Sequence, residues 1–473
     1  MGSLRWFGGG VFRAVFRSSV CLPLVAACLV AVVARGGVAA ESDRPNFLVI
    51  VADDLGYADL GVQGGKDVPT PNIDALAAGG MRFTNGYTSG CVCSPTRVGI
   101  VTGRYQQRTG HDANPHRGFG LAMSEMTIAS LFERAGYVTG MVGKWHLGEE
   151  AEEVPTARGF DEFYGLLPHG IGAGGEKGVP VLRQTEVVAT PADHTVAFGD
   201  EAVAFIERHQ ADPFFLYLPF TAVHAPHLSP EEYQSRFAHV ADPSRRRYVA
   251  MLALLDDTVG RVMAELRRHD LEERTLVFFI SDNGGPTGAP DNGPLRGGKW
   301  SLWEGGIRVP FFIQWKGHVP AGAVCDELVI QLDMAPTMLA AAGISAPAEA
   351  KLDGVNLLPL LEGESQRLER DSLFWRFGVQ FAARQGDWKL VKPSLADEPM
   401  LFNLADDVGE SRDLAGERPD KVAELTALWN EWNAGNIAPR WDDARWNGLD
   451  VKQADRAKAK AAKNKTKKKR AAK

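Results

Sequence analysis

One short segment of the chain combines a cysteine with an arginine four positions later. It reads Cys93-Ser94-Pro95-Thr96-Arg97 and is followed by Thr102-Gly103-Arg104. A cysteine at such a position is a candidate nucleophile, and Arg97 would share a turn or a helix start with it. The simpler alternative is an ordinary thiol packed in the core. The proline, the arginine and the Thr-Gly-Arg run favour a chemical role.

Two polar pairs stand directly after apolar runs that predict buried strands. Asp53 and Asp54 follow the run 47–52, and Asp282 and Asn283 follow the run 276–280. Carboxylate and amide oxygens suit Ca²⁺ or Mg²⁺ better than zinc. The glycines at 284 and 285 permit the sharp turn that would let adjacent side chains reach one ion. These pairs therefore predict a site for a hard divalent cation.

Lysines and histidines form a third group of candidates. Lys144 lies just after the strand predicted over 137–142, and Lys299 is the last residue of a glycine-rich run. A compact ammonium group suits a tetrahedral anion, and an imidazole titrates near neutrality, as an acid–base group must. The histidines of interest are His146, His224 and His227. Taken singly, the lysines would be surface charges, and His227 is as well explained as a loop residue.

Together these segments resemble the formylglycine-dependent type I sulfatases of the alkaline-phosphatase-like superfamily. The resemblance runs from Arg44 to about Asn433 and includes the runs 384–389 and 401–404. In that family a formylglycine-generating enzyme oxidises the cysteine. One hydroxyl of the hydrated aldehyde attacks the sulfur of a sulfate ester, and the other then expels sulfate. The resemblance implies a sulfatase acting on a sulfated carbohydrate or an aryl sulfate ester.

The resemblance also assigns roles to the candidates. Cys93, as formylglycine, is the nucleophile and a metal ligand, and Arg97 stabilises it. His146 contacts the hydrate, and His224 protonates the leaving group. Lys144 and Lys299 bind the sulfate. Apart from the resemblance, His227 lies close to His224 in the sequence and is a candidate for contact with the substrate. Asp53, Asp54, Asp282 and Asn283 hold the metal, with Ca²⁺ favoured over Mg²⁺.

Strand and helix patterns alternate from Asn46 onward, which predicts an α/β fold with a large mixed, mostly parallel sheet sandwiched by helices. Functional residues gather at the C-terminal ends of the strands in such sheets. The expected strands cover 47–52, 137–142, 214–220, 276–280 and 310–315, and the expected helices cover 123–135 and 248–268. Short strand patterns at 372–377, 381–384 and 388–391 and a helical one at 421–432 predict a small antiparallel subdomain. We assign 41–363 to a catalytic domain and 364–445 to this subdomain.

The two ends differ in composition from the body. Residues 1–40 carry arginines, an apolar stretch and small residues before Glu41, which is the layout of a signal peptide and predicts an exported protein, periplasmic or secreted. A membrane anchor or a lipoprotein at Cys28 are the alternatives. Residues 446–473 predict a disordered basic tail, with eleven Lys or Arg between 452 and 473. The tail could contact acidic surfaces, but export argues against nucleic acid.

The cysteine content is too low for a disulfide-built fold. Besides Cys93, the mature chain would keep Cys91 and Cys325. They could pair if the fold brought them together, but two small buried thiols are the simpler expectation.

Two other functions fit parts of the pattern. One is a phosphonate or phosphate ester hydrolase of the same fold, although the related phosphatases usually carry serine or threonine as nucleophile and bind two zinc ions. The other is a non-catalytic binder of sulfated glycans. A binder would be marked by loss of the nucleophile or of the metal ligands, and the sequence retains both.

Overall fold

The computed structural model describes residues 10, 44–115, 119–167 and 179–441. The predicted signal peptide, apart from Gly10, and the predicted basic tail lie outside the described residues. A ten-stranded sheet has the order β11-β2-β10-β9-β1-β8-β4-β5-β6-β7. Its five central strands, β9, β1, β8, β4 and β5, are mutually parallel, whereas β10, β6 and β7 pair antiparallel with their neighbours. The predicted mixed, mostly parallel sheet is confirmed.

The strands of this sheet are β1 (Asn46–Ala52), β2 (Met81–Phe83), β4 (Val138–Lys144), β5 (Glu162–Leu166), β6 (Val181–Arg183), β7 (Glu186–Val188), β8 (Phe214–Pro219), β9 (Thr275–Ser281), β10 (Phe311–Gln314) and β11 (Ala323–Cys325). A two-stranded sheet pairs β3 (Gly86–Tyr87) with β12 (Val329–Ile330).

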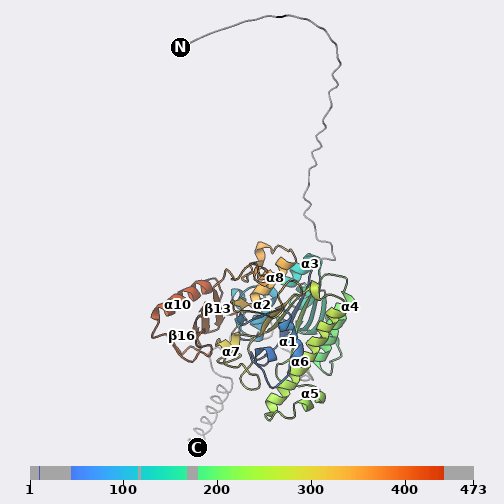
Figure 1. Ribbon diagram of the computed structural model, residues 1–473, viewed down its shortest axis with the longest axis horizontal. Helices are drawn as coiled ribbons and strands as arrows, with labels where there is room; N and C mark the ends of the chain where they lie inside the picture. The colour runs from blue at the N-terminus through green and yellow to red at the C-terminus, as the bar shows by residue number, and fades with distance from the viewer. Residues whose placement is uncertain (1–9, 11–43, 116–118, 168–178, 442–473) are drawn as a thin grey trace, which may run out of the picture. The chain divides into compact units, whose positions relative to one another are not determined.

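Helices cover both faces of the large sheet (Figure 1). In β1, Leu48 and Ile50 pack into a core shared with α1 (Pro71–Ala78), α4 (His194–Arg208) and α6 (Pro243–Arg268). Phe47 and Val49 point to the opposite core, shared with α2 (Cys93–Thr102), α3 (Ile128–Arg134) and α8 (Met334–Ala341). Because successive side chains of a strand alternate between faces, a strand buried on both faces is expected to be apolar, as β1 is from Phe47 to Ala52. The remaining helices are α5 (Glu231–Arg236), α7 (Glu304–Ile307) and α9 (Leu358–Leu361).

A separate four-stranded antiparallel sheet follows. It consists of β13 (Ser372–Phe377), β14 (Gln380–Gln385), β15 (Trp388–Lys392) and β16 (Met400–Asn403), in that order. Helix α10 (Pro419–Ala434) packs on it through Leu425, which contacts the cluster formed by Ala383, Leu390 and Leu401. The predicted small antiparallel sheet with one helix is present.

Buried charges join this small sheet to the segment between β9 and β10 of the large one. The Lys389 ammonium lies 2.8 Å from Glu304 Oε1 and 2.8 Å from Glu410 Oε1, and all three side chains are fully buried. Tyr87 donates a 2.6 Å hydrogen bond to Glu304 Oε2. Glu304 begins α7, so the small sheet holds the start of that helix.

The main departure from the predicted elements concerns α3. Met123 and Met126 extended the apolar pattern and predicted a helix from residue 123, but the helix begins at Ile128. Thr127 is its N-cap and accepts a hydrogen bond from the Ser130 amide (3.1 Å). A threonine that satisfies a free amide of the first turn favours a helix start over its continuation.

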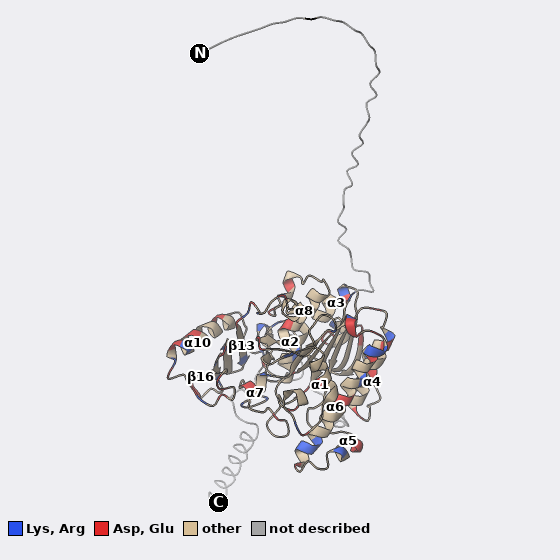
Figure 2. Ribbon diagram, in the orientation of Figure 1, with Lys and Arg blue, Asp and Glu red and all other residues tan. Residues whose placement is uncertain are grey.

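Surface charge and hydropathy add two observations. Acidic and basic residues are interspersed along α4, α5 and α6 (Figure 2). No helix in the described part of the chain is long and apolar enough to cross a membrane.

Cys91 is buried, as expected, but Cys325 is a half-buried free thiol at the edge strand β11.

Candidate active site

The two polar pairs of the sequence meet at one edge of the sheet. Strands β1 and β9 are parallel and in register, with Ala52 opposite Ser281. The residues that follow each strand therefore emerge side by side. The Asn283 amide donates a 2.8 Å hydrogen bond to Asp54 Oδ1. All four side chains, Asp53, Asp54, Asp282 and Asn283, are buried.

Cys93 is the first residue of α2, which places its side chain at the end of the helix that faces these carboxylates. Its sulfur lies 3.4 Å from Asp53 Oδ1 and 3.3 Å from the Lys299 ammonium. Burial raises the pKa of the Cys93 thiol, and the charges of Asp282 and Asp53 raise it further. The side chain is thus a neutral thiol that donates to Asp53.

Arg97 lies one helical turn after Cys93 and is fully buried. Its Nη2 is 2.7 Å from Asp282 Oδ2, and its Nη1 donates a 2.7 Å hydrogen bond to the carbonyl of Lys144. The guanidinium therefore connects α2 to the ends of β9 and β4.

The two lysines complete a compact set of opposite charges. Lys144 Nζ lies 2.6 Å from Asp53 Oδ2, and Lys299 Nζ lies 2.6 Å from Asp54 Oδ1. With Arg97 on Asp282, each buried carboxylate has a cation in contact. Burying a charge is costly unless it is paired, and these pairs offset that cost.

Neighbouring charges lower the pKa of Asp53, whereas the pKa values of Asp282 and Lys299 are raised. Burial alone would raise the pKa of Asp53, but Lys144, with His224, Arg97 and Lys299, holds it well below its usual range. Burial and the Asp53 charge raise the pKa of Asp282. Burial would lower the pKa of Lys299, yet Asp54, with Cys93, Asp53 and Asp282, outweighs it and raises the pKa, which keeps the ammonium charged.

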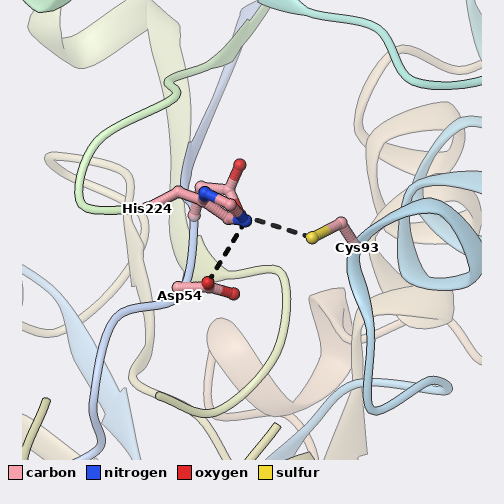
Figure 3. A group of neighbouring side chains, drawn as sticks. Asp54, Cys93 and His224 are labelled. Carbon is pink, nitrogen blue, oxygen red and sulfur yellow. Dashed lines mark hydrogen bonds and ion pairs between the residues drawn. The ribbon is translucent and has the colours of Figure 1, made fainter. Parts of the chain in front are cut away.

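His224 lies at the open side of this group. Figure 3 shows its imidazole directed toward the Asp54 carboxylate and the Cys93 sulfur, and the distance from Nε2 to Asp54 Oδ2 is 3.5 Å. Its Nδ1 is 2.6 Å from the carbonyl of Ala225. A carbonyl can only accept, so Nδ1 carries a hydrogen and Nε2 is the nitrogen that gains or loses a proton.

The other two histidines are held differently. His227 packs its ring edge-on against Tyr248 at 5.3 Å, and burial lowers its pKa to about 4, which leaves it neutral near pH 7. His146 is buried and has a positive φ of 61°, a conformation rare for a residue with a side chain. Its backbone conformation thus sets where its ring lies.

Two residues near His146, Ser94 and His111, were not predicted from the sequence as part of the site. Ser94 Oγ donates a 2.7 Å hydrogen bond to the His146 carbonyl and lies 2.7 Å from His111 Nε2. Because the Ser94 hydrogen is used on the carbonyl, His111 donates to Ser94. Ser94 stood inside the cysteine segment and could have been singled out, whereas no local pattern marks His111.

The side chains gathered here could hold a divalent metal ion. One ligand atom each from Asp53, Asp54, Cys93 and His224 lies within 4.8 Å of the others. Asn283 Oδ1 is buried and has no hydrogen-bond partner among the described residues. An unsatisfied buried oxygen beside two carboxylates is what a calcium ligand would offer.

Comparison with known proteins agrees with this geometry. The sulfatase family model matches residues 45–344, and a model of the N-sulphoglucosamine sulphohydrolase C-terminal region matches residues 298–427. N-acetylgalactosamine-6-sulfatase of Sus scrofa is 36% identical over 386 residues, which cover 75% of this chain and 72% of that protein. Arylsulfatase A of Homo sapiens is 35% identical, with coverage of 81% and 87%.

Solved structures show the same fold. Ps i-CgsB in complex with k-i-k-neocarrahexaose superimposes with a TM-score of 0.80 at 32% identity, covering 84% of this chain and 94% of that one. Phosphonate monoester hydrolase of Agrobacterium radiobacter shares the fold with a TM-score of 0.62 at 22% identity, with coverage of 83% and 95%. The chain belongs to the type I sulfatase family of alkaline-phosphatase-like fold and is a sulfatase.

Proposed function

We propose that this sulfatase hydrolyses sulfate monoesters of sulfated carbohydrates with a formylglycine made from Cys93. The observation that carries the proposal is the position of Cys93. Its side chain begins α2 between the Lys299 ammonium at 3.3 Å and the Asp53 carboxylate at 3.4 Å. A nucleophile at that position would face both a cation for the sulfate and the oxygens of a metal site.

The metal proposed is Ca²⁺, with Mg²⁺ less favoured. Asp53, Asp54, Asp282, Asn283 and residue 93 would hold it, and it would supply Lewis-acid polarisation of a sulfate oxygen and of the nucleophile.

The chain's own cations would bind the sulfate. Lys144 and Lys299 present ammonium groups from two sides of the carboxylates, and both are buried where water screens little. Arg97, anchored on Asp282, adds a fixed positive charge one turn from the nucleophile and would stabilise its deprotonated form.

The histidines would handle protons. Nε2 of His224 can deliver a proton to the leaving oxygen, because Nδ1 is held by the Ala225 carbonyl and keeps the ring oriented. His146 would hydrogen-bond the hydroxyl groups of residue 93. His227 would contact the substrate as a neutral imidazole.

Several features support a carbohydrate as substrate. The relatives include an N-acetylgalactosamine-6-sulfatase, and a structural neighbour is in complex with k-i-k-neocarrahexaose. We infer a sulfated polysaccharide or its oligosaccharides, with galactose- or N-acetylgalactosamine-type sugars favoured. The aryl sulfate of an assay would be a surrogate.

The proposal extends to the protein's surroundings. Residues 1–40 would direct export to the periplasm or the medium, and a formylglycine-generating enzyme would act on the chain during maturation. The catalytic domain would span 41–363 and the small subdomain 364–445. The tail at 446–473 would provide electrostatic contact with acidic surfaces.

The test is sulfate release by protein co-produced with a formylglycine-generating enzyme, with conversion of residue 93 checked by peptide mass. The panel holds sulfated saccharides, one aryl sulfate and one phosphonate monoester, with Cys93→Ala as the inactive control. Release from a saccharide by the converted protein alone supports the proposal. Turnover of the phosphonate only, silence across the panel after full conversion, or an active Cys93→Ala variant would overturn it.

A further inference from the structure

Trp300 has a backbone conformation that its side chain disfavours. Its φ is 75°, and it is one of seven non-glycine residues with positive φ in the described chain. Three of these seven, Asp54, His146 and Trp300, lie at the candidate active site. Such conformations persist only where the surrounding structure enforces them, and they are often found at functional sites.

The surroundings of Trp300 do enforce it. The Trp300 amide donates a 3.0 Å hydrogen bond to the carbonyl of Cys91, two residues before the nucleophile. Its carbonyl accepts a 3.2 Å hydrogen bond from Nε2 of Gln380, a buried residue of β14. Glycine would meet the same backbone requirement without strain, so the tryptophan side chain needs a separate explanation.

The indole ring lies next to the sulfate-binding position. The Lys299 ammonium is 5.4 Å from the centre of the Trp300 ring and 3.3 Å from the Cys93 sulfur. A sulfate bound by Lys299 would place the sugar that carries it within reach of this ring.

The small sheet packs against the indole through β13. The ring of Phe377, a fully buried residue of β13, lies 6.3 Å from the Trp300 ring, centre to centre. Trp300 as a whole residue is only half-buried. This contact with the small sheet therefore does not bury the residue completely.

We propose that Trp300 is a specificity-determining residue whose indole face stacks on the pyranose ring that bears the sulfate. The C–H groups on one face of a pyranose form an apolar surface that fits an aromatic ring. The inference rests on the proposed function and adds a reason for selectivity: a sulfate ester without a ring would make no such contact.

The experiment compares two substrates on converted enzyme, a sulfated galactose-type saccharide and a short alkyl sulfate. We expect Trp300→Leu to lower kcat/KM for the saccharide by roughly tenfold or more, mainly through KM, because an aliphatic chain fills space but offers no flat face. The loss on the alkyl sulfate should be clearly smaller. Trp300→Phe should keep most of the preference for the saccharide.

Lys351→Leu is the matched control for a leucine placed at a positive φ. Lys351 is exposed, has a φ of 46° and lies outside the site, so this variant should change neither activity. Equal losses on both substrates in Trp300→Leu, or no loss on either, would assign the indole to packing and overturn the inference. A wild-type enzyme inactive on every sulfate ester would instead overturn the proposed function.

Discussion

Arg97 and Asp282 are 185 residues apart in the sequence, and Arg97 Nε and Nη2 reach the same carboxylate oxygen, Oδ2, at 3.1 and 2.7 Å. Both side chains are fully buried. The pair ties the helix that begins at Cys93 to the strand end that carries Asn283. The proposed nucleophile Cys93 and the proposed metal ligands are thus linked by one buried contact.

Arg97→Lys should reveal this dependence. A lysine keeps the charge but cannot reach the Asp282 oxygen and the Lys144 carbonyl together, since it lacks the planar guanidinium. We expect sulfate release to fall by about 10²-fold or more, as when one preorganised donor is removed, together with a lower melting temperature. Initial rates and thermal unfolding measure the two effects.

Arg376→Lys is the control for Arg97→Lys. Arg376 contacts the buried Asp112 carboxylate at 2.7 and 2.9 Å, and its other side-chain hydrogen bonds go to Asn433 and the Ile437 carbonyl, not to a residue proposed as nucleophile, metal ligand or sulfate-binding cation. This variant should lower the melting temperature and leave kcat unchanged. If Arg376→Lys lost activity as severely while still folded, the effect of Arg97 would be one of general stability.

Asn283→Ala should weaken calcium binding. The Asn283 side chain offers a buried oxygen with no hydrogen-bond partner among the described residues. Calcium should raise the melting temperature of the wild type, because a ligand that binds only the folded state stabilises that state. At a ligand concentration a hundred times Kd, the free energy of unfolding rises by about 2.7 kcal/mol. A chelator should reverse this rise in melting temperature. The Asn283→Ala variant should need a higher calcium concentration than the wild type to reach the same rise.

The control for calcium binding is Asn356→Ala. The exposed Asn356 side chain accepts only from the Leu358 amide at 3.0 Å. The rise in melting temperature that calcium causes should be the same in Asn356→Ala as in the wild type. A calcium response unchanged in Asn283→Ala, measured by calorimetry or thermal unfolding, would remove Asn283 from the ligand set.

His224→Asn should lower the rate of hydrolysis most for substrates whose leaving group is most basic. A sugar alkoxide needs a proton as it leaves, whereas an acidic phenol does not. We expect a loss of roughly 10²–10⁴-fold on a saccharide sulfate and a much smaller one on an aryl sulfate with an acidic phenol. Rates over a series of aryl sulfates would show a steeper dependence on phenol pKa in the variant. An equal loss across the series would assign His224 another role.

Glu410→Gln should change how stability depends on pH. Burial raises the pKa of Glu410 to about 7, with the Glu304 charge adding to it although Lys389 opposes both. The folded chain therefore keeps a proton that the unfolded chain loses above the ordinary value of 4.5. Its contribution to stability is present below that value and is lost as the pH rises through about 7.

Denaturant unfolding at pH 5 and pH 8 tests this assignment. The unfolding free energy of the wild type should fall relative to that of Glu410→Gln by on the order of 1–3 kcal/mol between the two values. The wild type and Glu304→Gln should instead have parallel profiles between pH 5 and pH 8 and should diverge only below about pH 4.5. Lys389 and Arg308 overcome burial and lower the pKa of Glu304 to about 2, so its ionised form stabilises the fold above 4.5. Parallel pH profiles for the wild type and Glu410→Gln would contradict the assignment.

The sequence by itself determined the long apolar strands at the centre of the large sheet and the polar residues that follow them. The apolar run 47–52 and the run 276–280 predict β1 and β9, because a strand covered on both faces needs apolar side chains throughout. Parallel strands expose their C-terminal ends at one edge, so the pairing of Asp53 and Asp54 with Asp282 and Asn283 could be expected. The cysteine segment identified the family.

Only the tertiary structure decided which charges meet and how the backbone is held there. The register that sets Ala52 opposite Ser281, the Arg97–Asp282 contact and the support of His146 by Ser94 and His111 join segments far apart in the chain. No local pattern encodes them, because they follow from how whole layers pack. The positive φ of Trp300 is of the same kind: a hydrogen bond donated to the Cys91 carbonyl and one accepted from Gln380 hold it against the preference of the residue itself.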